Sequence, residues 1–485
     1  MNLRLHNTLT GEKDVFEPLE AGHARIYTCG PTVHGFAHIG NFRAFTFNDL
    51  LRRHLLATGC RVTQVMNITD VEDKIIRKAS AEGVSISDFT APYEAAFFDD
   101  LQTLRVQKAE VYPRATEHVA DMVHLIERLL ATGHAYIADG DVYFRVGSFP
   151  AYGRLAKLDR SGLRAGARVA QDEYEKESAS DFALWKAEQP GEAAVGAAWD
   201  APFGRGRPGW HIECSAMSMR YLGESFDIHC GGVDLMFPHH ENEIAQSQAV
   251  TGKPLARFWL HSEHLAQATG EKMSKSLGNI STLRDLVDAG HDPLAIRYFL
   301  MANAHYRSKL RLDEAGLHAA GEQVRRLQEF EARVRQAKAQ PSPTGGGEAP
   351  IPSSTANDSW LERQAEDVLD HFRAALDDDL NLPQAMGYVF DFVREANAAL
   401  DAAQAGAASL EAMTRLLQVV DSYLDILGGS EQVLEEEVER LIAERDSARA
   451  RRDFARADQI REDLQRRGIL LEDTKEGVRW RRTRR

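Results

Sequence analysis

Residues 25–41 read RIYTCGPTVHGFAHIGN, a short apolar run that a Gly-Pro pair interrupts before a helical pattern begins. The pattern predicts a strand, a turn and the start of a helix. A second apolar run, residues 61–68, contains Val and Ile and predicts another strand. In such a βαβ unit the first strand ends beside the amino terminus of the helix, whose free N–H groups and dipole attract phosphate. The stretch therefore predicts a nucleotide site.

Length and composition predict several folded domains and no membrane segment. A chain of 485 residues is too long for one ordinary hydrophobic core and should hold roughly three or four domains. Its 43% content of hydrophobic residues is enough to form the cores of these domains. No window approaches the ~18 unbroken apolar residues of a membrane span. Residues 1–10 lack the charged segment followed by an apolar segment that marks a secretory signal. We therefore expect a cytoplasmic protein.

Charge and cysteine content argue against two classes of protein. A formal net charge of −15 disfavours a protein that coats nucleic acid through bulk electrostatics. Four cysteines without C-x-x-C spacing are too few for a disulfide framework, so metal binding or burial is expected for them. Residues 449–485 differ from the rest, with 13 Lys and Arg against 7 Asp and Glu, a net charge of +6. This basic tail predicts a local contact with a polyanion, and a solvated, disordered end is the alternative.

Two short motifs make the chain similar to a known family. His38-Ile39-Gly40-Asn41 resembles the first signature of the class I aminoacyl-tRNA synthetases, with Asn41 where many members carry a second His. Residues 272–276 read KMSKS, the full second signature, about 230 residues downstream and just after a strand candidate. Further similarity lies in Cys29 and in the runs GWHIECS at 209–215 and FPHHENE at 237–243. With these, nearly the whole chain resembles the cysteinyl-tRNA synthetase family.

The resemblance implies an ATP site at the carboxyl edge of the sheet. The residues that it assigns to ATP are His38, Gly40, Asn41, Gly231, Gly232, Lys272 and Lys275. Lysines on a mobile loop can neutralise charge at the α-phosphate and the leaving pyrophosphate, with His38 donating from the opposite side. His38, Lys272 and Lys275 are therefore the predicted catalytic residues, and magnesium is expected with ATP. The alternative for His38 is a histidine that only starts a helix, and the alternative for the loop at 272–276 is a basic surface turn. Family members usually have Gly in place of Cys230.

His239 and Glu243 are the first candidates for metal ligands, because residues four apart can share an ion from one helical face. Taken alone, a surface hydrogen-bonding pair is the better interpretation, because such pairs are ordinary. Cys29 and Cys214 add two soft ligands, a combination that suits zinc. The resemblance implies one zinc per chain held by these four residues, with His240 as the second choice of histidine. Four protein ligands predict a structural zinc, whereas the resemblance implies that the thiolate of the substrate joins the ion.

Thr69 and Trp210 are the predicted cysteine-binding residues. Thr69 follows the second strand at the carboxyl edge of the sheet, and in the family the matching Thr belongs to the amino-acid pocket. An N-cap of a helix that opens at Val71 is an equally sensible role for it. Trp210 lies four residues before Cys214, and the matching Trp of the family lines the same pocket. A core position is the alternative for Trp210, and His34 is treated as peripheral.

The predicted fold class is α/β, a Rossmann-like doubly wound parallel sheet with an insertion, followed by an α-helical bundle and a small α+β carboxyl-terminal domain. The patterns predict helices at about 314–339, 359–377, 384–403 and 409–427, tail helices at about 432–450 and 454–467, and a hairpin of 469–471 with 478–481. The expected domains are a catalytic domain in two halves, 1–118 and 225–313, an insertion at 119–224, a bundle at 314–430 and an anticodon-binding domain at 431–485.

The resemblance implies the activity of a cysteinyl-tRNA synthetase. The carboxylate of L-cysteine would attack the α-phosphate of ATP, and the adenylate would pass cysteine to the 3′ end of tRNA(Cys). One alternative is a ligase that joins cysteine to an amino sugar, which would lack a full tRNA-reading tail. Another is a degenerate, synthetase-like tRNA-binding protein, although no signature lysine or zinc ligand is missing. The sequence does not fix the oligomeric state, and a monomer is the working expectation.

Overall fold

The computed structural model describes residues 2–158, 181–267, 282–339 and 355–427, and parts of the tail at 441–442, 445, 456–457, 460–461, 464, 469–474 and 477–482. Lys272 and Lys275 of the KMSKS motif lie outside the described residues, as does most of the two predicted tail helices. The chain divides into two compact units, residues 1–424 and 425–485.

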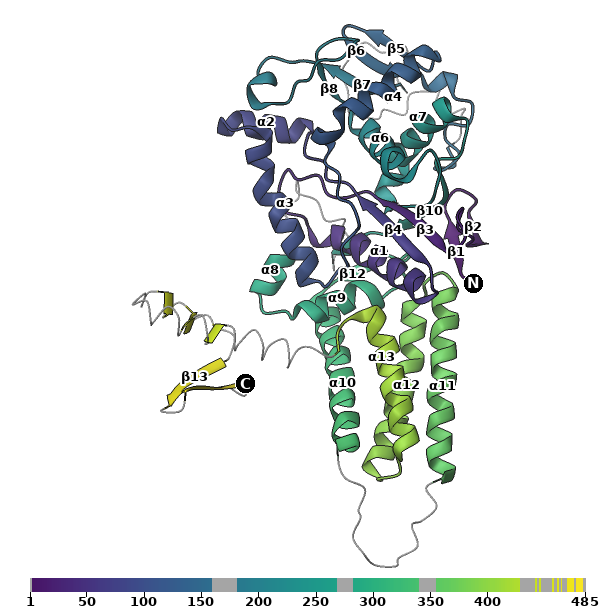
Figure 1. Cartoon of the computed structure of the whole chain (residues 1–485), viewed down its shortest axis with the longest axis vertical. Helices are drawn as coiled ribbons and strands as arrows, with labels where there is room; N and C mark the ends of the chain where they lie inside the picture. The colour runs from purple at the N-terminus through teal and green to yellow at the C-terminus, as the bar shows by residue number, and fades with distance from the viewer. Residues whose placement is uncertain are drawn as a thin grey trace, which may run out of the picture. The chain divides into compact units, whose positions relative to one another are not determined.

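A parallel sheet of four strands forms the centre of the first unit (Figure 1). The strands are β3 (His23–Thr28), β4 (Arg61–Met66), β9 (Phe226–Gly232) and β10 (Ala256–Ser262). Their order is β10-β9-β3-β4, and each neighbouring pair runs parallel. The chain leaves β3 toward β4 and later returns to the other side of β3. Strands β3 and β9 therefore meet at a switch point, where open α/β sheets bind ligands, and the predicted doubly wound sheet is confirmed.

Helices cover both faces of this sheet (Figure 1). Helix α1 (Ile39–Ala57) connects β3 to β4 and buries Phe42, Phe45 and Leu51. Helix α6 (Trp210–Leu222) packs against β3 and β4 from the other face. Because α1 starts where β3 ends, its amino terminus faces the carboxyl edge of the sheet, as the sequence predicted.

The chain between β4 and β9 adds helices and a second, antiparallel sheet of order β5-β6-β7-β8. Its strands are β5 (Ala135–Ala138), β6 (Asp141–Phe144), β7 (Phe182–Ala187) and β8 (Gly206–Pro208). Its helices before α6 are α2 (Asp73–Glu82), α3 (Ile86–Thr103), η1 (Ala115–His118), α4 (Val119–Ala131), η2 (Val146–Ser148) and η3 (Ala193–Val195). This segment interrupts the parallel sheet, as the sequence predicted.

Shorter elements complete the region around the parallel sheet. A hairpin of β1 (Arg4–Asn7) and β2 (Glu12–Val15) precedes β3. After β9 come η4 (Val233–Leu235), η5 (Met236–His240) and α7 (Glu241–Thr251). After β10 come β11 (Leu265–Gln267), α8 (Leu283–Asp288), α9 (Pro293–Ala302) and β12 (Leu310–Leu312). Strands β11 and β12 pair in parallel with each other.

Four long helices follow as a bundle (Figure 1). They are α10 (Glu314–Ala339), α11 (Thr355–Asp377), α12 (Leu382–Asp401) and α13 (Ala407–Leu424). Leu317, Val324 and Leu327 of α10 recur at helical spacing and are buried, which is why the pattern predicted this helix correctly. None of the described helices, in the bundle or elsewhere, combines the length and the apolar character that a membrane span requires.

A buried network of hydrogen bonds around Arg297 joins helix α13 of the bundle to helix α1. The guanidinium of Arg297 on α9 donates to Asp49 Oδ2 of α1 at 2.6 Å and to the carbonyl of Leu424 at 2.5 Å. Arg53 Nε donates to the same carboxylate oxygen at 2.9 Å. Both partners of the Arg297–Asp49 pair have fully buried side chains. Since α1 begins near the carboxyl edge of the sheet, this network fixes the bundle relative to that edge.

In the second unit the described strands form one hairpin. Strand β13 (Ile469–Thr474) pairs antiparallel with β14 (Gly477–Arg482), with Leu471 opposite Trp480. The predicted hairpin is confirmed, and each strand is a few residues longer than the sequence pattern indicated.

Candidate active site and metal centre

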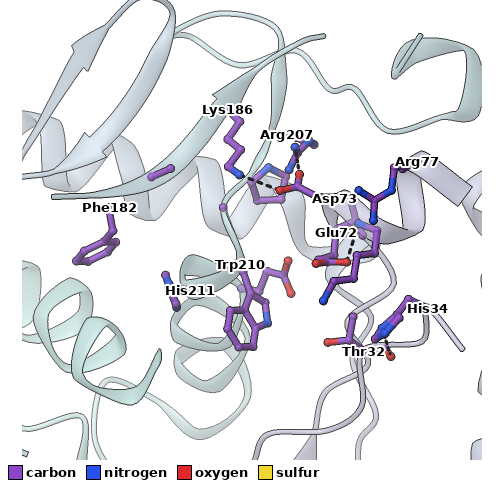
Figure 2. A pocket seen from close by; sticks show the side chains of 16 residues that line it. Thr32, His34, Glu72, Asp73, Arg77, Phe182, Lys186, Arg207, Trp210 and His211 are labelled. Atoms are coloured by element: carbon purple, nitrogen blue, oxygen red, sulfur yellow. Dashed lines mark hydrogen bonds and ion pairs between the residues drawn. The ribbon is translucent and has the colours of Figure 1, made fainter. Parts of the chain in front are cut away.

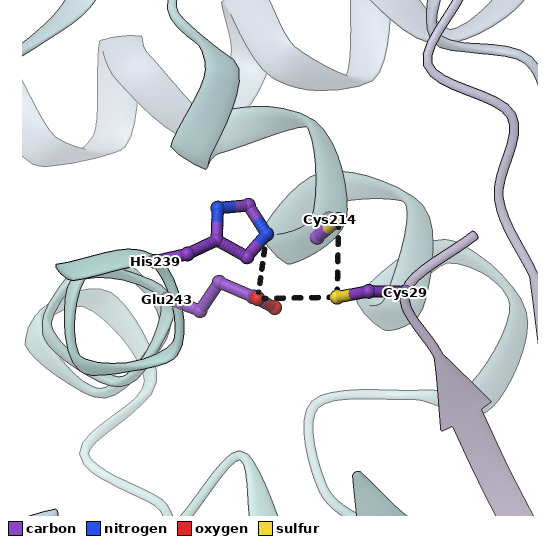
Figure 3. A group of neighbouring side chains, drawn as sticks. All are labelled: Cys29, Cys214, His239 and Glu243. Atoms are coloured by element: carbon purple, nitrogen blue, oxygen red, sulfur yellow. Dashed lines mark hydrogen bonds and ion pairs between the residues drawn. The ribbon is translucent and has the colours of Figure 1, made fainter. Parts of the chain in front are cut away.

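Four side chains from separate parts of the chain meet at the carboxyl edge of the parallel sheet (Figure 3). Cys29 directly follows β3, Cys214 lies on α6, His239 lies in η5 and Glu243 lies on α7. One ligand atom from each residue lies within 4.8 Å of the others. The structure thus brings together the four residues that the sequence predicted, and this first group is a candidate site for a metal ion.

The atoms of the first group are spaced as ligands of a single small ion would be. Cys29 Sγ lies 3.9 Å from Cys214 Sγ and 3.9 Å from Glu243 Oε1. His239 Nε2 lies 3.2 Å from the same carboxylate oxygen. Cys214, His239 and Glu243 are buried, and Cys29, although partly exposed as a residue, offers its ligand atom within a buried group. The group is therefore enclosed by the protein.

A second group of candidate ligands overlaps the first. Cys29 and Glu243 also lie within 4.8 Å of ring nitrogens of His229 and His240. His240 Nε2 is 3.4 Å from Cys29 Sγ, and His229 Nε2 is 2.9 Å from Glu243 Oε2. His240 is the second choice predicted from the sequence. His229 was missed, because a single histidine in an apolar strand has no local signal that distinguishes a ligand from a buried core residue.

Burial determines the protonation of these side chains. It lowers the pKa of His239 and His240 well below the usual range, so both rings are neutral and can offer a lone pair to a metal. Burial also raises the pKa of the Cys29 thiol and of the Glu243 carboxyl well above their usual values. A bound cation would oppose this second effect, because it favours the thiolate and the carboxylate.

Further polar contacts orient the candidate histidine ligands. His239 Nδ1 lies 2.9 Å from His211 Nδ1, and the ring of His239 stacks on Trp210 with centroids 4.3 Å apart. His240 Nδ1 lies 2.8 Å from His261 Nε2. Histidines that bind metals are usually held in this way through the second ring nitrogen. Since both histidines have such a contact, the contact does not decide between the two groups.

A cavity of about 460 Å³ opens beside the first group at the amino end of α1. We call it the nucleotide cavity, because the sequence predicts a nucleotide at this end of the helix. Its lining includes Cys29, His38, Gly40, Asn41, Trp210 and Gly232. His38 is the N-cap residue of α1, and its N–H donates to Asn41 Oδ1 at 3.1 Å. Asn41 therefore supports the start of the helix. A Cβ at position 40 would lie 2.9 Å from His38 Nδ1, so Gly40 leaves room for the His38 ring.

Gly231 and Cys230 hold the end of β9 close to the candidate ligands. A Cβ at position 231 would lie 2.6 Å from His240 Cε1, so the glycine leaves room for that imidazole. Gly231 is not among the described residues that line the nucleotide cavity, whereas Gly232 is. Cys230 is buried, and its carbonyl accepts the N–H of Cys29 at 3.2 Å. The main chain at Cys230 thus positions Cys29.

Thr69 is not among the described residues that line the nucleotide cavity or the second cavity described next. Its side chain is buried, and its hydroxyl donates to Glu213 Oε2 at 3.1 Å. The alternative role of Thr69 as an N-cap is wrong. Helix α2 begins at Asp73, and the Glu72 carboxylate caps it by accepting the N–H of Lys74 at 2.8 Å.

A second cavity, of about 440 Å³, adjoins the first between α2, α6 and the antiparallel sheet (Figure 2). The two cavities share Thr32, His34, Lys74 and Trp210. Lys186 Nζ lies 3.1 Å from Asp73 Oδ2, and Arg207 also pairs with Asp73, which ties β7 and β8 to α2. His34, treated as peripheral from the sequence, lines both cavities. Its place in the turn between β3 and α1 was the signal that could have identified it.

Three family models match the chain. The model described as the tRNA synthetases class I (C) catalytic domain matches residues 15–322. The DALR domain matches residues 371–428, and the cysteinyl-tRNA ligase anticodon binding domain matches residues 431–481.

Curated relatives match the chain over almost its whole length. A protein of Solibacter usitatus named Cysteine--tRNA ligase is 48% identical over 485 residues, covering 99% of this chain and 100% of the relative. The protein of the same name from Chlamydia pneumoniae is 45% identical over 477 residues, and the match covers 98% of this chain and 97% of that relative.

Solved structures of class I synthetases share the fold. Methionyl-tRNA synthetase of Mycobacterium tuberculosis in complex with methionyl-adenylate has a TM-score of 0.58 at 16% identity, covering 83% of this chain and 89% of that chain. A leucyl-tRNA synthetase of Agrobacterium radiobacter K84 in complex with tRNA has a TM-score of 0.60 at 11% identity and covers 85% of each chain. At these identities the likeness shows the fold.

Proposed function

The chain belongs to the cysteinyl-tRNA synthetases, class I ligases that join cysteine to tRNA, and we propose that the first group and the two cavities are the parts that perform this reaction. The family and the ligase activity agree with the sequence prediction and are confirmed. The metal, the role of each residue and the route of the tRNA are the content of the proposal, together with a place in the cytoplasm, where tRNA is charged.

Zinc is the proposed metal, one per chain, with Cys29, Cys214, His239 and Glu243 as ligands. In a tetrahedral zinc site two sulfurs are about 3.8 Å apart, and a nitrogen and an oxygen about 3.3 Å apart, given the usual bond lengths. The two sulfurs of the first group are 3.9 Å apart, and the nitrogen and oxygen are 3.2 Å apart. Two thiolates with one imidazole and one carboxylate are donors that suit zinc. The residues present therefore fit the ion.

One observation carries the proposal: Cys29 belongs both to the first group and to the wall of the nucleotide cavity. A metal at that position can receive a ligand from a molecule bound in the cavity. When bound, zinc would stabilise the thiolate of substrate cysteine, whereas the hydroxyl of serine is harder and far less acidic. Trp210 would form the side wall of the amino-acid pocket, and Thr69 would support it from behind through Glu213.

His38, Gly40 and Asn41 would hold the phosphates of ATP at the amino end of α1, where the helix dipole favours negative charge. Gly232, which lines the cavity, would admit the adenine, whereas Gly231 makes room for the His240 ring instead. Lys272 and Lys275, outside the described residues, would neutralise charge on the phosphates together with Mg²⁺. The carboxylate of cysteine then attacks the α-phosphate, the bond to the β-phosphate breaks and pyrophosphate leaves.

The second cavity would receive the 3′-terminal nucleotide of tRNA(Cys). It shares Trp210 and His34 with the nucleotide cavity, so a ribose hydroxyl placed in it would lie next to the adenylate. Lys74 and Arg77 in its lining offer positive charge to phosphodiester groups. The tail that matches the anticodon binding model would read the far end of the same tRNA.

Cysteine-dependent exchange of pyrophosphate into ATP tests the proposal. The purified full chain should catalyse exchange with cysteine and very little with serine, because the two differ only in the atom presented to the metal. Equal exchange with both amino acids would contradict a thiol-reading metal site. Cysteine exchange without charging of tRNA, but with transfer of cysteine to an amino sugar, would instead favour the other ligase class.

We predict that removal of residues 431–485 separates activation from charging. The truncated protein should keep most of its cysteine-dependent pyrophosphate exchange, because the described site lies within residues 29–265. Its apparent KM for tRNA(Cys) should rise by roughly tenfold or more, since contacts to the far end of the tRNA are lost. The measurement is aminoacylation at varied tRNA concentration.

An anticodon-substituted tRNA is the control for this truncation. The intact enzyme should charge it poorly, and the truncated protein should discriminate much less between the two tRNAs. Binding by the full chain should also depend more steeply on salt, because the end of the removed segment, residues 449–485, carries a net charge of +6. If both proteins charged tRNA equally well and discriminated anticodons equally, the tail would have no reading role.

A further inference from the structure

Three charged side chains to which the proposed function gives no role meet in the wall of the second cavity, where the antiparallel sheet faces α2 (Figure 2). Lys186 Nζ of β7 lies 3.1 Å from Asp73 Oδ2, and the guanidinium of Arg207 on β8 contacts Asp73 Oδ1. Burial raises the pKa of Asp73, but Arg207 and Lys186 more than offset this effect and lower the pKa below its usual value. One ionised carboxylate therefore serves two cations in this wall.

The fold holds the two cations more firmly than it holds the carboxylate. The side chains of Lys186 and Arg207 are 16% and 9% exposed, whereas that of Asp73 is 55% exposed. Arg207 Nε also donates to Glu192 Oε1 at 2.9 Å, and the buried Glu192 accepts the N–H of Gln189 at 2.9 Å. Asp73 is the first residue of α2, and its pairs are partly exposed, so its carboxylate can turn into water at a small cost.

The charges of this cluster balance only while an anion occupies the place of Asp73. The two cations are matched by the carboxylates of Asp73 and Glu192. If Asp73 turned away, one positive charge would remain unmatched among side chains that have little contact with water, which is costly. A phosphodiester group carries one negative charge, and its oxygens accept hydrogen bonds from Lys and Arg as carboxylate oxygens do. It can therefore replace the carboxylate without changing the net charge.

We propose that Lys186 and Arg207 form a phosphate site for the 3′ end of the tRNA, which Asp73 occupies until a phosphodiester group displaces it. The inference rests on the proposed use of the second cavity and adds a subsite to it. Lys74 and Arg77 would meet the RNA backbone from α2, and the two cations would meet it from the antiparallel sheet. Phosphate contacts of this kind fix the register of a bound nucleic acid. In the free protein the carboxylate would keep the two cations from binding unrelated anions.

The test is Asp73→Asn in the full chain, which removes the charge of the internal competitor and keeps the size of the side chain. The apparent KM for tRNA(Cys) in aminoacylation should fall by roughly two- to fivefold, the range that a partly exposed ion pair allows. Binding of tRNA by this variant should depend more steeply on salt, because the uncovered cations hold a salt counterion that the phosphate releases. A residue that only joins the antiparallel sheet to α2 would give the opposite sign, a higher KM.

Lys186→Ala tests the cation itself. It should raise the KM for tRNA(Cys) by roughly threefold or more, since a phosphate contact is lost. In the Asp73→Asn background the increase should be larger than in the parent, because there the ammonium meets the phosphate without a competitor. In that background the slope of log affinity against log salt should also fall by about one.

Asp378→Asn and Lys13→Ala are the matched controls for these two variants. Lys13 Nζ lies 2.9 Å from Asp378 Oδ1, and the side chain of Asp378 is 52% exposed, close to the value for Asp73. Neither control residue is among the described residues that line the nucleotide cavity or the second cavity. Both control variants should charge tRNA(Cys) with the KM of the parent.

Each outcome bears on a different claim. An unchanged or higher KM for tRNA(Cys) in Asp73→Asn overturns the phosphate site, while the proposed use of the second cavity stands if Arg77→Ala raises that KM. An unchanged KM in both Arg77→Ala and Lys186→Ala overturns the use of the cavity, and this inference with it. A lower KM for pyrophosphate in the exchange assay of Asp73→Asn, with an unchanged KM for tRNA, would assign the site to the leaving pyrophosphate and overturn its assignment to tRNA.

Discussion

The variant Cys214→Ser should lose most of its zinc, and its rate of cysteine activation should be about 10³-fold lower than that of the parent. A neutral serine hydroxyl is a far poorer ligand than a thiolate, so the site would lose one of its two soft donors. The rate at limiting cysteine should fall because the thiolate of the substrate would lose the metal that holds it, and about 1.4 kcal/mol of lost interaction corresponds to tenfold in rate. Metal content by atomic absorption and pyrophosphate exchange measure the two losses.

Cys60→Ser is the matched control for this variant. Cys60 is also a buried thiol, with 6% of its surface exposed, and it belongs to neither candidate group of the described residues. It should keep about one equivalent of zinc. Stoichiometric zinc in both Cys29→Ser and Cys214→Ser would falsify the site. His239→Ala and His240→Ala then decide between the two groups, since the zinc content should fall only in the variant that lacks the true ligand.

Lys275→Ala should lower the rate of adenylate formation by ~10²-fold or more, with a smaller effect on cysteine affinity. Lys275 belongs to the KMSKS motif, and its ammonium would meet charge that develops on the phosphates as pyrophosphate leaves. A contact that acts mainly in the transition state affects the rate more than ground-state binding. The measurement is pyrophosphate exchange at saturating ATP and at varied cysteine.

Lys253→Ala is the control for the loss of a lysine. Lys253 Nζ contacts Glu224 at 2.6 Å on the surface, and it lines neither described cavity. Exchange by this variant should stay close to that of the parent. Near-normal exchange by Lys275→Ala would remove Lys275 from the reaction and would leave Lys272 as the remaining candidate of the motif.

Local patterns predicted the parts of the fold that short-range physics decides. The strand, turn and helix of residues 25–57 follow from periodicity and a Gly-Pro break, and the structure has β3 and α1 there. Helix α10 spans the predicted 314–339 because its buried residues repeat along one face. The error at Thr69 is also local in origin. Thr and Glu are both able to cap a helix, and only the structure shows that Glu72 caps α2.

The site was predicted in part, because its ligands meet only in three dimensions. The sequence spacing of His239 and Glu243 suggested a pair, but Cys29 and Cys214 joined them through the resemblance to a family. No pattern could place His229 against Glu243, because the contact between β9 and α7 side chains forms only in the folded chain. The second cavity was missed for the same reason, since it lies between elements far apart in the sequence.

The most direct test of a thiol-reading metal centre is a titration of the cobalt-substituted protein. Addition of L-cysteine should change the ligand-field and sulfur-to-metal charge-transfer bands, because a further thiolate enters the coordination shell. Addition of L-serine at the same concentration should leave the spectrum as it was. A spectrum that cysteine does not alter, in a protein that still forms the cysteinyl adenylate, would show that the metal is structural and that the thiol is recognised elsewhere.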